Sequence, residues 1–520
     1  MRRPSPSSRK NSAQRGGGLA ASHSVINLNG FTNLYLTSNA ASGNGGGAWL
    51  MYSFLWSGGR VEIGGNDAAG SGGGVHADSG SFVMLQPSPA GRPNIYNNTA
   101  VDNGGGLCVL EAQASLKDVR IGLDFSGNPS ANRCLGSAAG DGGGGLALLQ
   151  SRAWLTNCWV AYNRAEYYGG GIEVSGSRLT MKGNPALLSP GDFHPPNRIF
   201  GNVVSNGSLG IGGGLHAVDS TVRIEDALVY SNLALYGGGL HADAPSTVLV
   251  VNAAILLNQA SVTGGGVRAY GSITHMDLLH CAVVNNSRGG ISVASSAEVS
   301  LTNCIVGLNQ SEQITAGHSV SYSDVAGGYA GAGNIQLDPF FILSDVYDVR
   351  LGYGSPCINN GAVAAAVAAD AIGEPRPFGA GYDMGAYEYN GDTYDTDGER
   401  MTDGWEADHS LDPWVGDALD NDDSDEYLNI EEYISDTDPF DGDSHLQITS
   451  ITNGATRDVG FLSSTARVYA LYTTPHMTND ATWTIVGTNL NLRGNGVTYT
   501  AIDTNAPAGQ AFYRVDVQVP

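Results

Sequence analysis

The sequence predicts an all-β protein whose main part is a parallel β-helix, and a repeated glycine block is the first reason. Blocks of three glycines followed by an apolar residue recur every 25 to 43 residues between residues 16 and 290. A period of this size is typical of solenoids and other repeat architectures. The blocks begin at Gly16, Gly45, Gly72, Gly104, Gly143, Gly169, Gly212, Gly237 and Gly264, and a shortened pair begins at Gly289.

The residues that follow each block favour strands over helices. Apolar and polar residues alternate in stretches such as 240–243 and 267–270, as expected for a strand with one buried face. The blocks leave no room for a pair of helices between them, and so many glycines would penalise a helix. One coil of a parallel β-helix per repeat therefore explains the pattern over residues 1–336.

An asparagine recurs at one place in the repeat and predicts a stacked turn. Asn232, Asn258, Asn285 and Asn309 are separated by 26, 27 and 24 residues, and Asn163 occupies the same place in an earlier repeat. Asparagine tolerates the left-handed conformation and hydrogen-bonds turn backbone. We therefore expect a ladder of amide side chains inside a turn, with the glycines at bends where a Cβ would clash with the next coil.

The glycine and asparagine pattern resembles the polymorphic outer membrane protein repeat and the wider class of right-handed, pectin-lyase-like β-helices. The resemblance covers about residues 16–310 and implies a fold more than a function. Residues 337–389, which end in Asp-Met-Gly-Ala-Tyr-Glu-Tyr, resemble the choice-of-anchor Q module that follows β-helical coils in secreted bacterial proteins. We expect this module to cover the open end of the solenoid.

The C-terminal part divides into an acidic linker, residues 390–445, and a further domain, residues 446–520. Short alternating strands separated by Asp and Gly predict a small β-sandwich for the latter. The chain has 50 acidic and 25 basic residues, and residues 392–443 hold twenty of the acids against Arg400 alone. The negative electrostatic potential of so many acidic residues disfavours binding of nucleic acid or anionic membrane and favours bound cations.

The acidic linker contains two twelve-residue loops with the ligand spacing of a calcium site. Calcium takes six to eight oxygens, including a backbone carbonyl at the seventh place and a bidentate glutamate at the twelfth. The sixth place, usually glycine, holds Arg400 and Glu426, which lowers the expected affinity, and a solvated acidic linker is the alternative. The predicted ligands are Asp395, Asp397, Glu399, Met401, Asp403 and Glu406 in the first loop, and Asn421, Asp423, Asp425, Tyr427, Asn429 and Glu432 in the second.

These loops resemble the thrombospondin type 3 and dockerin-like calcium repeats of extracellular proteins. The resemblance implies Ca²⁺ as the cofactor and an extracellular or bacterial cell-surface location. We expect calcium to remove repulsion among the carboxylates and to rigidify the linker. Residues 1–15 lack the apolar run of a signal peptide, so we expect the chain to begin inside a longer solenoid, with its export signal upstream.

A row of polar side chains after the glycine blocks is the candidate ligand-binding site. If the residue after each block points inward, the following residue faces solvent, and equivalent residues lie about 5 Å apart on successive coils. Such a row could bind an acidic sugar or serve in acid–base chemistry, whereas an ordinary solvated ladder is the alternative. The row consists of His216, His241 and Arg268, with Asp219 and Asp243 close by.

The sequence gives little support for catalysis. A glycosidase needs two carboxylates about 5–9.5 Å apart, and adjacent coils could bring together Asp219 and Asp243, or Glu225 and Asp226. No catalytic motif resembling those of polygalacturonases or pectate lyases is present. We therefore predict a monomeric, non-catalytic adhesin or scaffold that binds extended polysaccharide or another surface. A polysaccharide lyase or glycoside hydrolase acting on acidic glycans is the alternative, and a structural spacer is a third interpretation.

Two negative features complete the predictions. No run of about 18 apolar residues is present, so the sequence predicts no membrane-spanning helix. The six cysteines include no Cys-x-x-Cys pair, which makes a zinc ribbon improbable. Cys281 and Cys304 are 23 residues apart, close to one coil, and we expect stacked, buried thiols rather than a disulfide.

Overall fold

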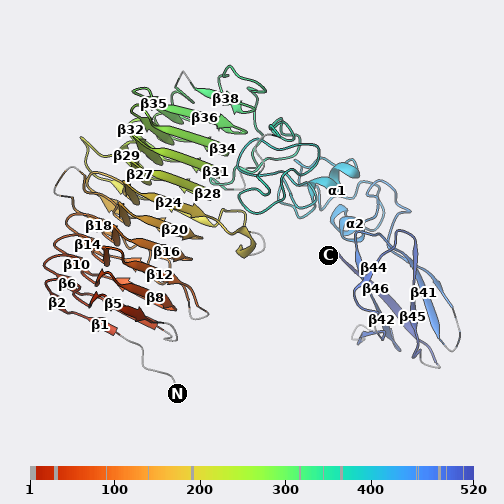
Figure 1. The fold of residues 1–520 in the computed structure, drawn as a ribbon. Coiled ribbons are helices and arrows are strands. Elements are labelled where there is room, and N and C mark those ends of the chain that lie inside the picture. The colour runs from red at the N-terminus through yellow and green to blue at the C-terminus, as the bar shows by residue number, and fades with distance from the viewer. Residues whose placement is uncertain are drawn as a thin grey trace. The chain divides into compact units, whose positions relative to one another are not determined.

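The computed structural model describes residues 7–520 except 29–32, 89–90, 137, 139, 189–191, 316–317, 343–344, 364–366, 453, 455, 478–481, 488 and 507–508. The chain forms two compact units, Met1–Tyr389 and Asn390–Pro520. Three parallel sheets with residue-for-residue pairing between coils run through the first unit, and Figure 1 shows the coils stacked along it. The predicted parallel β-helix is thus confirmed.

One sheet begins directly after the glycine blocks and contributes one four-residue strand to each coil. Leu215, Leu240 and Val267 pair in sequence, so the same place after each block returns on the next coil. The sheet consists of β3 (Leu19–Ser22), β7 (Ala48–Met51), β11 (Val75–Asp78), β15 (Leu107–Leu110), β19 (Leu146–Leu149), β23 (Ile172–Ser175), β27 (Leu215–Val218), β30 (Leu240–Asp243), β33 (Val267–Tyr270) and β35 (Ile291–Ala294).

The largest sheet has two arms that meet at a bend. Three long strands run through both arms, and their bend residues Asp226, Asn252 and His280 take left-handed φ values of 52°, 50° and 49°. The long strands are β28 (Thr221–Tyr230), β31 (Thr247–Leu256) and β34 (His275–Val284). The arm before the bend adds β4 (Val25–Asn27), β8 (Phe54–Gly58), β12 (Phe82–Gln86), β16 (Gln113–Lys117), β20 (Arg152–Thr156), β24 (Arg178–Lys182), β36 (Glu298–Thr302) and β38 (Ser319–Ser321). The arm after the bend adds β1 (Ser7–Arg9), β5 (Asn33–Thr37), β9 (Arg60–Gly64), β13 (Asn94–Tyr96), β17 (Arg120–Ile121), β21 (Trp159–Ala161), β25 (Asn197–Phe200), β37 (Ile305–Gly307) and β39 (Asp324–Val325).

A third sheet of shorter strands closes each coil ahead of the next glycine block. Its strands are β2 (Ser12–Ala13), β6 (Ala40–Ala41), β10 (Asp67–Ala68), β14 (Thr99–Ala100), β18 (Arg133–Cys134), β22 (Arg164–Ala165), β26 (Val203–Val204), β29 (Leu233–Tyr236) and β32 (Gln259–Thr263). The glycine corner that follows is tight: Gly212 has φ 68°, and a Cβ on Gly213 would lie 2.4 Å from the carbonyl oxygen of Gly238 on the next coil. These corners therefore admit no side chain, as the sequence predicts.

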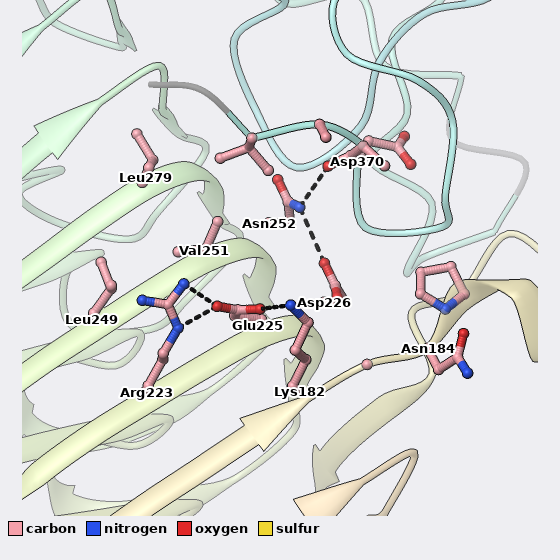
Figure 2. Close-up of a pocket in the computed structure, with 15 residues that line it drawn as sticks. Lys182, Asn184, Arg223, Glu225, Asp226, Leu249, Val251, Asn252, Leu279 and Asp370 are labelled. Carbon is pink, nitrogen blue, oxygen red and sulfur yellow. Dashed lines mark hydrogen bonds and ion pairs between the residues drawn. The ribbon is translucent and has the colours of Figure 1, made fainter. Parts of the chain in front are cut away.

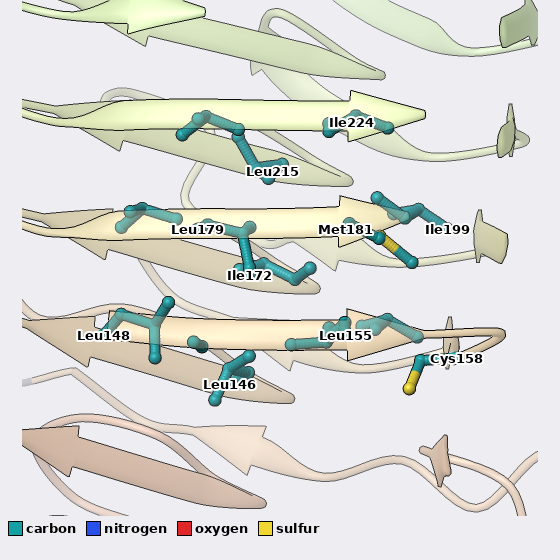
Figure 3. Close-up of a cluster of buried hydrophobic side chains, with 14 of the residues drawn as sticks. Leu146, Leu148, Leu155, Cys158, Ile172, Leu179, Met181, Ile199, Leu215 and Ile224 are labelled. Atoms are coloured by element: carbon teal, nitrogen blue, oxygen red, sulfur yellow. The ribbon is translucent and has the colours of Figure 1, made fainter. Parts of the chain in front are cut away.

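Inward-facing apolar side chains form one continuous core inside the coils. Figure 3 shows how equivalent positions stack, for example Leu155, Met181 and Ile224 on successive coils. All three are almost completely buried. Because each coil contributes side chains at the same places, the hydrophobic stabilisation grows coil by coil. All six cysteines are buried and free, which confirms the predicted thiols.

The predicted asparagine ladder is present and extends from Asn11 to Asn309. In each step the amide Nδ2 of one asparagine donates to Oδ1 of the next, as between Asn202 and Asn232 at 2.9 Å. One predicted member is wrong: the ladder residue is Asn286, and Asn285 precedes it in the left-handed bend with φ 54°. The ladder consists of Asn11, Asn39, Asn66, Asn98, Asn132, Asn163, Asn202, Asn232, Asn258, Asn286 and Asn309.

Residues 337–389 pack on the outer face of the coils and not over their open end. Leu228, Ala254 and Ala282, which face outward from the arm after the bend, share a buried cluster with Met384 and Tyr387 of this module. The last coil is covered instead by the segment just before the module, because Ser323 donates its N–H to Asn334 at 3.1 Å and Val325 donates to Ile335. The outward apolar residues of three coils explain this placement.

The described residues of the second unit form two short helices and two antiparallel sheets. The helices α1 (Asp403–Asp408) and α2 (Asn429–Ser435) lie in the acidic segment, and no helix of the described residues is long and apolar enough to cross a bilayer. The sheets share a core around Phe461 and Leu471. They comprise β40 (Ile448–Ile451), β41 (Arg457–Leu462) and β45 (Thr498–Asp503), and β42 (Val468–Thr474), β43 (Thr484–Ile485), β44 (Leu492–Arg493) and β46 (Phe512–Gln518).

Candidate functional site

The predicted ligand-binding row is aligned as expected, but its two histidines are buried and Arg268 is only partly exposed. His216, His241 and Arg268 pair on three successive coils. The two histidines are only 3% and 1% exposed, respectively. The residues that come directly before the glycine blocks cover this row. Tyr168 stacks on His216 with ring centroids 5.0 Å apart, and the Tyr236 ring centroid lies 4.1 Å from the Arg268 guanidinium carbon.

A network of charged side chains connects part of this row. His216 Nδ1 lies 2.8 Å from Glu173 Oε2, and its Nε2 lies 3.0 Å from Asp243 Oδ2. His241 Nε2 lies 3.1 Å from the other oxygen of Asp243. Asp219 does not belong to the network, because it begins the next turn with φ 48° and lines a separate surface groove with Arg152 and Arg178.

Burial and neighbouring carboxylates shift the pKa values of the two histidines of this network in opposite directions. Burial lowers the pKa of His216, but Glu173 and Asp243 outweigh burial and raise that pKa to about 10. Burial lowers the pKa of His241 to about 4, and its hydrogen bond to Asp243 only partly opposes this. The atoms of His216, His241 and Asp243 lie within metal-site distances of one another, but both nitrogens of His216 are occupied by carboxylates.

We expect His241→Gln to reduce the loss of stability that the N-terminal unit suffers in acid. Because the folded pKa of His241 lies below its unfolded value, its contribution is present above pH 6.5 and is lost as the pH falls through 4. The change should reduce the difference in unfolding free energy between pH 7 and pH 4 by about 3 kcal/mol. Denaturant unfolding at both pH values measures this, and an unchanged difference would contradict the assignment.

His216 provides an internal control with the opposite sign. Its folded pKa is raised, so its contribution is fully present below pH 6.5 and is lost as the pH rises through 10. His216→Gln should therefore lower stability more below pH 6.5 than above pH 10, and it should remove the decline in stability between these two pH values. Equal effects of both substitutions on both sides would show that the two histidines do not occupy different protonation states.

The first predicted calcium loop brings three acidic side chains together. One oxygen from each of Asp397, Glu399 and Glu406 lies within 4.8 Å of the others. Glu406 is fully buried, and neither of its carboxylate oxygens has a hydrogen-bond partner. Asp397 Oδ2 and Glu399 Oε1 are also buried without a partner. Buried carboxylate oxygens that point toward one another and accept no hydrogen bond fit the ligand preference of Ca²⁺.

The carboxylates of two predicted ligands in the first loop also accept hydrogen bonds from the loop itself. The Asp403 carboxylate accepts hydrogen bonds from Thr396 N–H and Oγ1, each at 2.6 Å, so this residue holds the loop closed. The Asp395 oxygens accept N–H groups of residues 398, 399 and 400. The Met401 side chain is buried beside Trp405, so only the backbone carbonyl oxygen of Met401 could bind a metal. Arg400 takes φ 84°, the conformation that glycine normally supplies at the sixth place.

Asp417 is a candidate ligand that the loop spacing did not reveal. Its Oδ1 is buried without a partner, and the neighbouring Ala418 donates its N–H to Glu399 Oε2 at 2.6 Å. The segment between the two loops therefore lies against the first. A single aspartate between two predicted loops carries no spacing signal of its own, so only the folded arrangement identifies it.

The second loop presents a similar set of oxygens. The Asn421 amide donates to the backbone carbonyl of Asp425 at 2.9 Å. The Asn429 amide donates to Asp422 and to the carbonyl of residue 417. The Tyr427 ring is exposed, so only the backbone carbonyl oxygen of Tyr427 could bind a metal. The side-chain oxygens that are buried and without hydrogen-bond donors belong to Asn421, Asp423, Asp425, Asn429 and Glu432.

Burial and repulsion between carboxylates raise the pKa values of glutamates in both loops. Burial, followed by the charges of Asp397 and Glu399, raises the pKa of Glu406 to about 8. Burial and neighbouring aspartates likewise raise the pKa of Glu432 to about 7. A bound cation would offset the free-energy cost of burying these charged carboxylates close together.

An open cleft of about 690 Å³ lies between the large sheet and residues 367–370 of the packed module (Figure 2). Leu249, Val251 and Leu279 from adjacent coils form its apolar side. At its rim Glu225 forms ion pairs with Lys182, at 3.0 Å, and with Arg223. Outward-facing positions of β24, β28, β31 and β34 thus meet the module in one place.

The cleft does not display two free carboxylates. Glu225 is neutralised by its two basic partners. Asp370 is buried and accepts the N–H groups of residues 372, 373, 374 and 388, so it serves the module's own turn. Asp226 remains: it accepts a hydrogen bond from Asn252 at 3.0 Å, and burial raises its pKa to about 7. The sequence singled out Glu225 and Asp226, but it gave no sign that the module forms the other wall.

Comparison with known proteins gives structural likenesses but no match by sequence. No protein-family model matches the chain, and no curated protein matches it. The crystal structure of pectate lyase Pel9A is similar to the chain with a TM-score of 0.34 and 11% sequence identity, over 71% of this chain and 97% of that chain.

Proposed function

We propose that the protein is a non-catalytic, extracellular β-helix that binds an extended polysaccharide and has a calcium-ordered C-terminal segment. The cleft beside Leu249 carries the binding part of this proposal. It crosses successive coils about 4.8 Å apart, so it offers repeated contacts to a long ligand. Its apolar side suits the faces of sugar rings, and the charged rim of Lys182 and Arg223 suits their polar edges.

Filling the cleft tests this proposal. Leu249→Arg places a long charged side chain across the cleft from a half-buried outward position and leaves the core intact. We expect retention on the immobilised polysaccharide identified by a glycan array to fall at least tenfold, with an unchanged melting temperature. Ser115→Arg, at the equivalent outward position several coils away, is the matched control. Unchanged retention with Leu249→Arg would overturn the cleft as the binding site.

The calcium part of the proposal is supported by the two sets of buried oxygens without donors. Asp397, Glu399, Glu406 and Asp417 would hold the first ion, and the second loop's amide and carboxylate oxygens the other. A side chain at the sixth place favours weak sites, with dissociation constants of about 10⁻⁴–10⁻³ M, as in extracellular modules. Titration calorimetry of the full chain should give two ions bound per chain. No heat with millimolar Ca²⁺ would overturn this part.

A polysaccharide lyase or glycoside hydrolase acting on acidic glycans is the second candidate function. Asp226 favours it, because a buried carboxyl with a pKa near 7 in a cleft has the property of a general acid or base. Incubation with polygalacturonate or alginate tests this function by the release of unsaturated or reducing ends. Release that disappears in Asp226→Asn would establish catalysis and replace the non-catalytic proposal. Absence of release supports binding alone.

A further inference from the structure

A second surface on the large sheet joins arginine and tryptophan side chains from successive coils. Arg120, Trp159 and Arg198 occupy the same outward position on β17, β21 and β25. The next residues in this column are Leu228 and Ala254, which the module covers. The column therefore changes from apolar and covered to basic and accessible at the edge of the module.

Trp159 fixes the arginines around it. The guanidinium carbons of Arg120 and Arg198 lie 4.9 and 4.6 Å from its ring centroid, and that of Arg92 lies 5.7 Å away. A guanidinium that packs over an aromatic ring keeps its N–H donors in its own plane, where they can meet the oxygens of an anion. The aromatic ring thus reduces the side-chain entropy that two long basic residues would lose on binding.

Only one of the three arginines at this surface is ion-paired among the described residues, although Asp124 lies near enough to act on Arg120. Arg198 pairs with Asp192 at 3.3 Å. Neither Arg92 nor Arg120 has a carboxylate within ion-pair distance in the described part of the chain. Burial and the charges of Arg92 and Arg198 lower the pKa of Arg120. Asp118 lines the same hollow but accepts a hydrogen bond from Asn157.

Two hollows flank the cluster and share Arg92. One lies beside Trp159, Arg198 and Leu187, and the other, of about 300 Å³, beside Arg60, Arg120 and Phe125. The Phe125 ring is 59% exposed, and the Arg60 guanidinium lies 4.8 Å from its centroid. The exposed ring offers stacking for a sugar ring, and the Arg92 and Arg120 guanidinium groups offer donors for its acid group, while Arg60 is ion-paired with Glu62 at 3.0 Å.

We propose that Arg92, Arg120 and Arg198, positioned by Trp159, bind the anionic group of an acidic sugar. This inference rests on the proposed polysaccharide binding and adds the charge class of the ligand. The acidic residues are concentrated in residues 392–443, outside the β-helix, so this local arginine cluster can still hold a sugar carboxylate or sulfate.

Calorimetric titration of the full chain with oligosaccharides of equal length tests the inference. The probes are an oligogalacturonate, a sulfated oligosaccharide, a neutral cello-oligosaccharide and a single-stranded oligodeoxynucleotide. We expect at least one acidic oligosaccharide to bind ten times more tightly than the neutral one, and the stronger of the two identifies carboxylate or sulfate as the anion. Arg92→Gln with Arg120→Gln should weaken that binding at least tenfold.

Matched substitutions separate this site from general charge effects. Arg152→Gln with Arg178→Gln removes the same charge from adjacent exposed positions elsewhere on the sheet and should leave affinity unchanged. Arg92→Gln alone changes an exposed residue, so it gives a measurable answer even if the Arg120 substitution lowers stability. Equal binding of neutral and acidic probes, equal losses in both double variants, or oligonucleotide binding as tight as that of the acidic probes would overturn the inference.

The two proposals fail in different ways. If Leu249→Arg abolishes polysaccharide retention while the arginine substitutions change no probe affinity, the cleft stands and this inference is overturned. If the arginine substitutions abolish acidic-probe binding while Leu249→Arg retains the polysaccharide, the arginine site is supported and the cleft is rejected.

Discussion

Asn202→Ala is expected to lower the free energy of unfolding of the N-terminal unit by roughly 2–6 kcal/mol. Asn202 is fully buried, and its Nδ2 donates to Asn232 Oδ1 and to the carbonyl of Val160 at 2.9 and 2.8 Å. Its Oδ1 accepts Asn163 N–H and Nδ2 at 2.9 and 3.0 Å. Alanine would leave the Asn163 N–H and the Val160 carbonyl buried without these partners, each at a cost of about 1–3 kcal/mol.

Denaturant unfolding of the variant and of Asn128→Ala measures the effect. Asn128 is exposed, and its amide donates only to Asp124 at 3.3 Å. Its loss should therefore change stability by less than about 0.5 kcal/mol. Similar small losses for Asn202 and Asn128 would show that the ladder does not stabilise the coils.

The periodic part of the fold was predictable because each coil repeats the same local constraints. Glycine corners and alternating strands identify a coil without any long-range information. The wrong prediction at Asn285 shows that the pattern locates the turn but not the residue within it that joins the ladder. Two adjacent asparagines fit the turn equally well by composition, yet only the second enters the ladder. The pairs Tyr162-Asn163 and Ser231-Asn232 follow the same rule, with a left-handed residue first.

The exposure of side chains was not predictable in the same way. Alternation assigns His216 and His241 to the outward face of their strands, but it does not say what covers that face. Here the preceding residues, such as Tyr168, lie over the row. The cleft depends on a contact between Asn252 and Ala369, 117 residues apart, and no local pattern encodes such a contact.

The two predicted calcium loops were identified from spacing, but spacing does not show which of their oxygens are buried and without hydrogen-bond partners. Spacing identified Glu406 and Glu432 correctly as buried carboxylates at the end of each loop. Spacing could not show that both oxygens of Asp403, another predicted ligand, accept hydrogen bonds from Thr396. It also could not single out the buried Oδ1 of Asp417, because this residue lies outside both loops.

Glu406→Gln is expected to remove most of the stabilisation that calcium gives to the first loop. At a calcium concentration 100 times the dissociation constant, one bound ion stabilises the folded unit by about 2.7 kcal/mol. Glu406 offers two buried oxygens without partners, whereas glutamine offers one neutral oxygen and an N–H₂ group that repels the ion. Calorimetric unfolding of the full chain with excess calcium and with chelator measures the difference.

The same substitution should act in the opposite direction without calcium. Because the folded pKa of Glu406 is raised to about 8, its unfavourable charge appears as the pH rises from about 4.5 through 8. Glutamine carries no charge, so at pH 7.5 with chelator the variant should be at least as stable as the wild type. Glu431→Gln, an exposed neighbour of the second loop's Glu432, is the matched control and should retain the full calcium response. A calcium response as large in Glu406→Gln as in this control would show that the buried carboxylate is not a ligand.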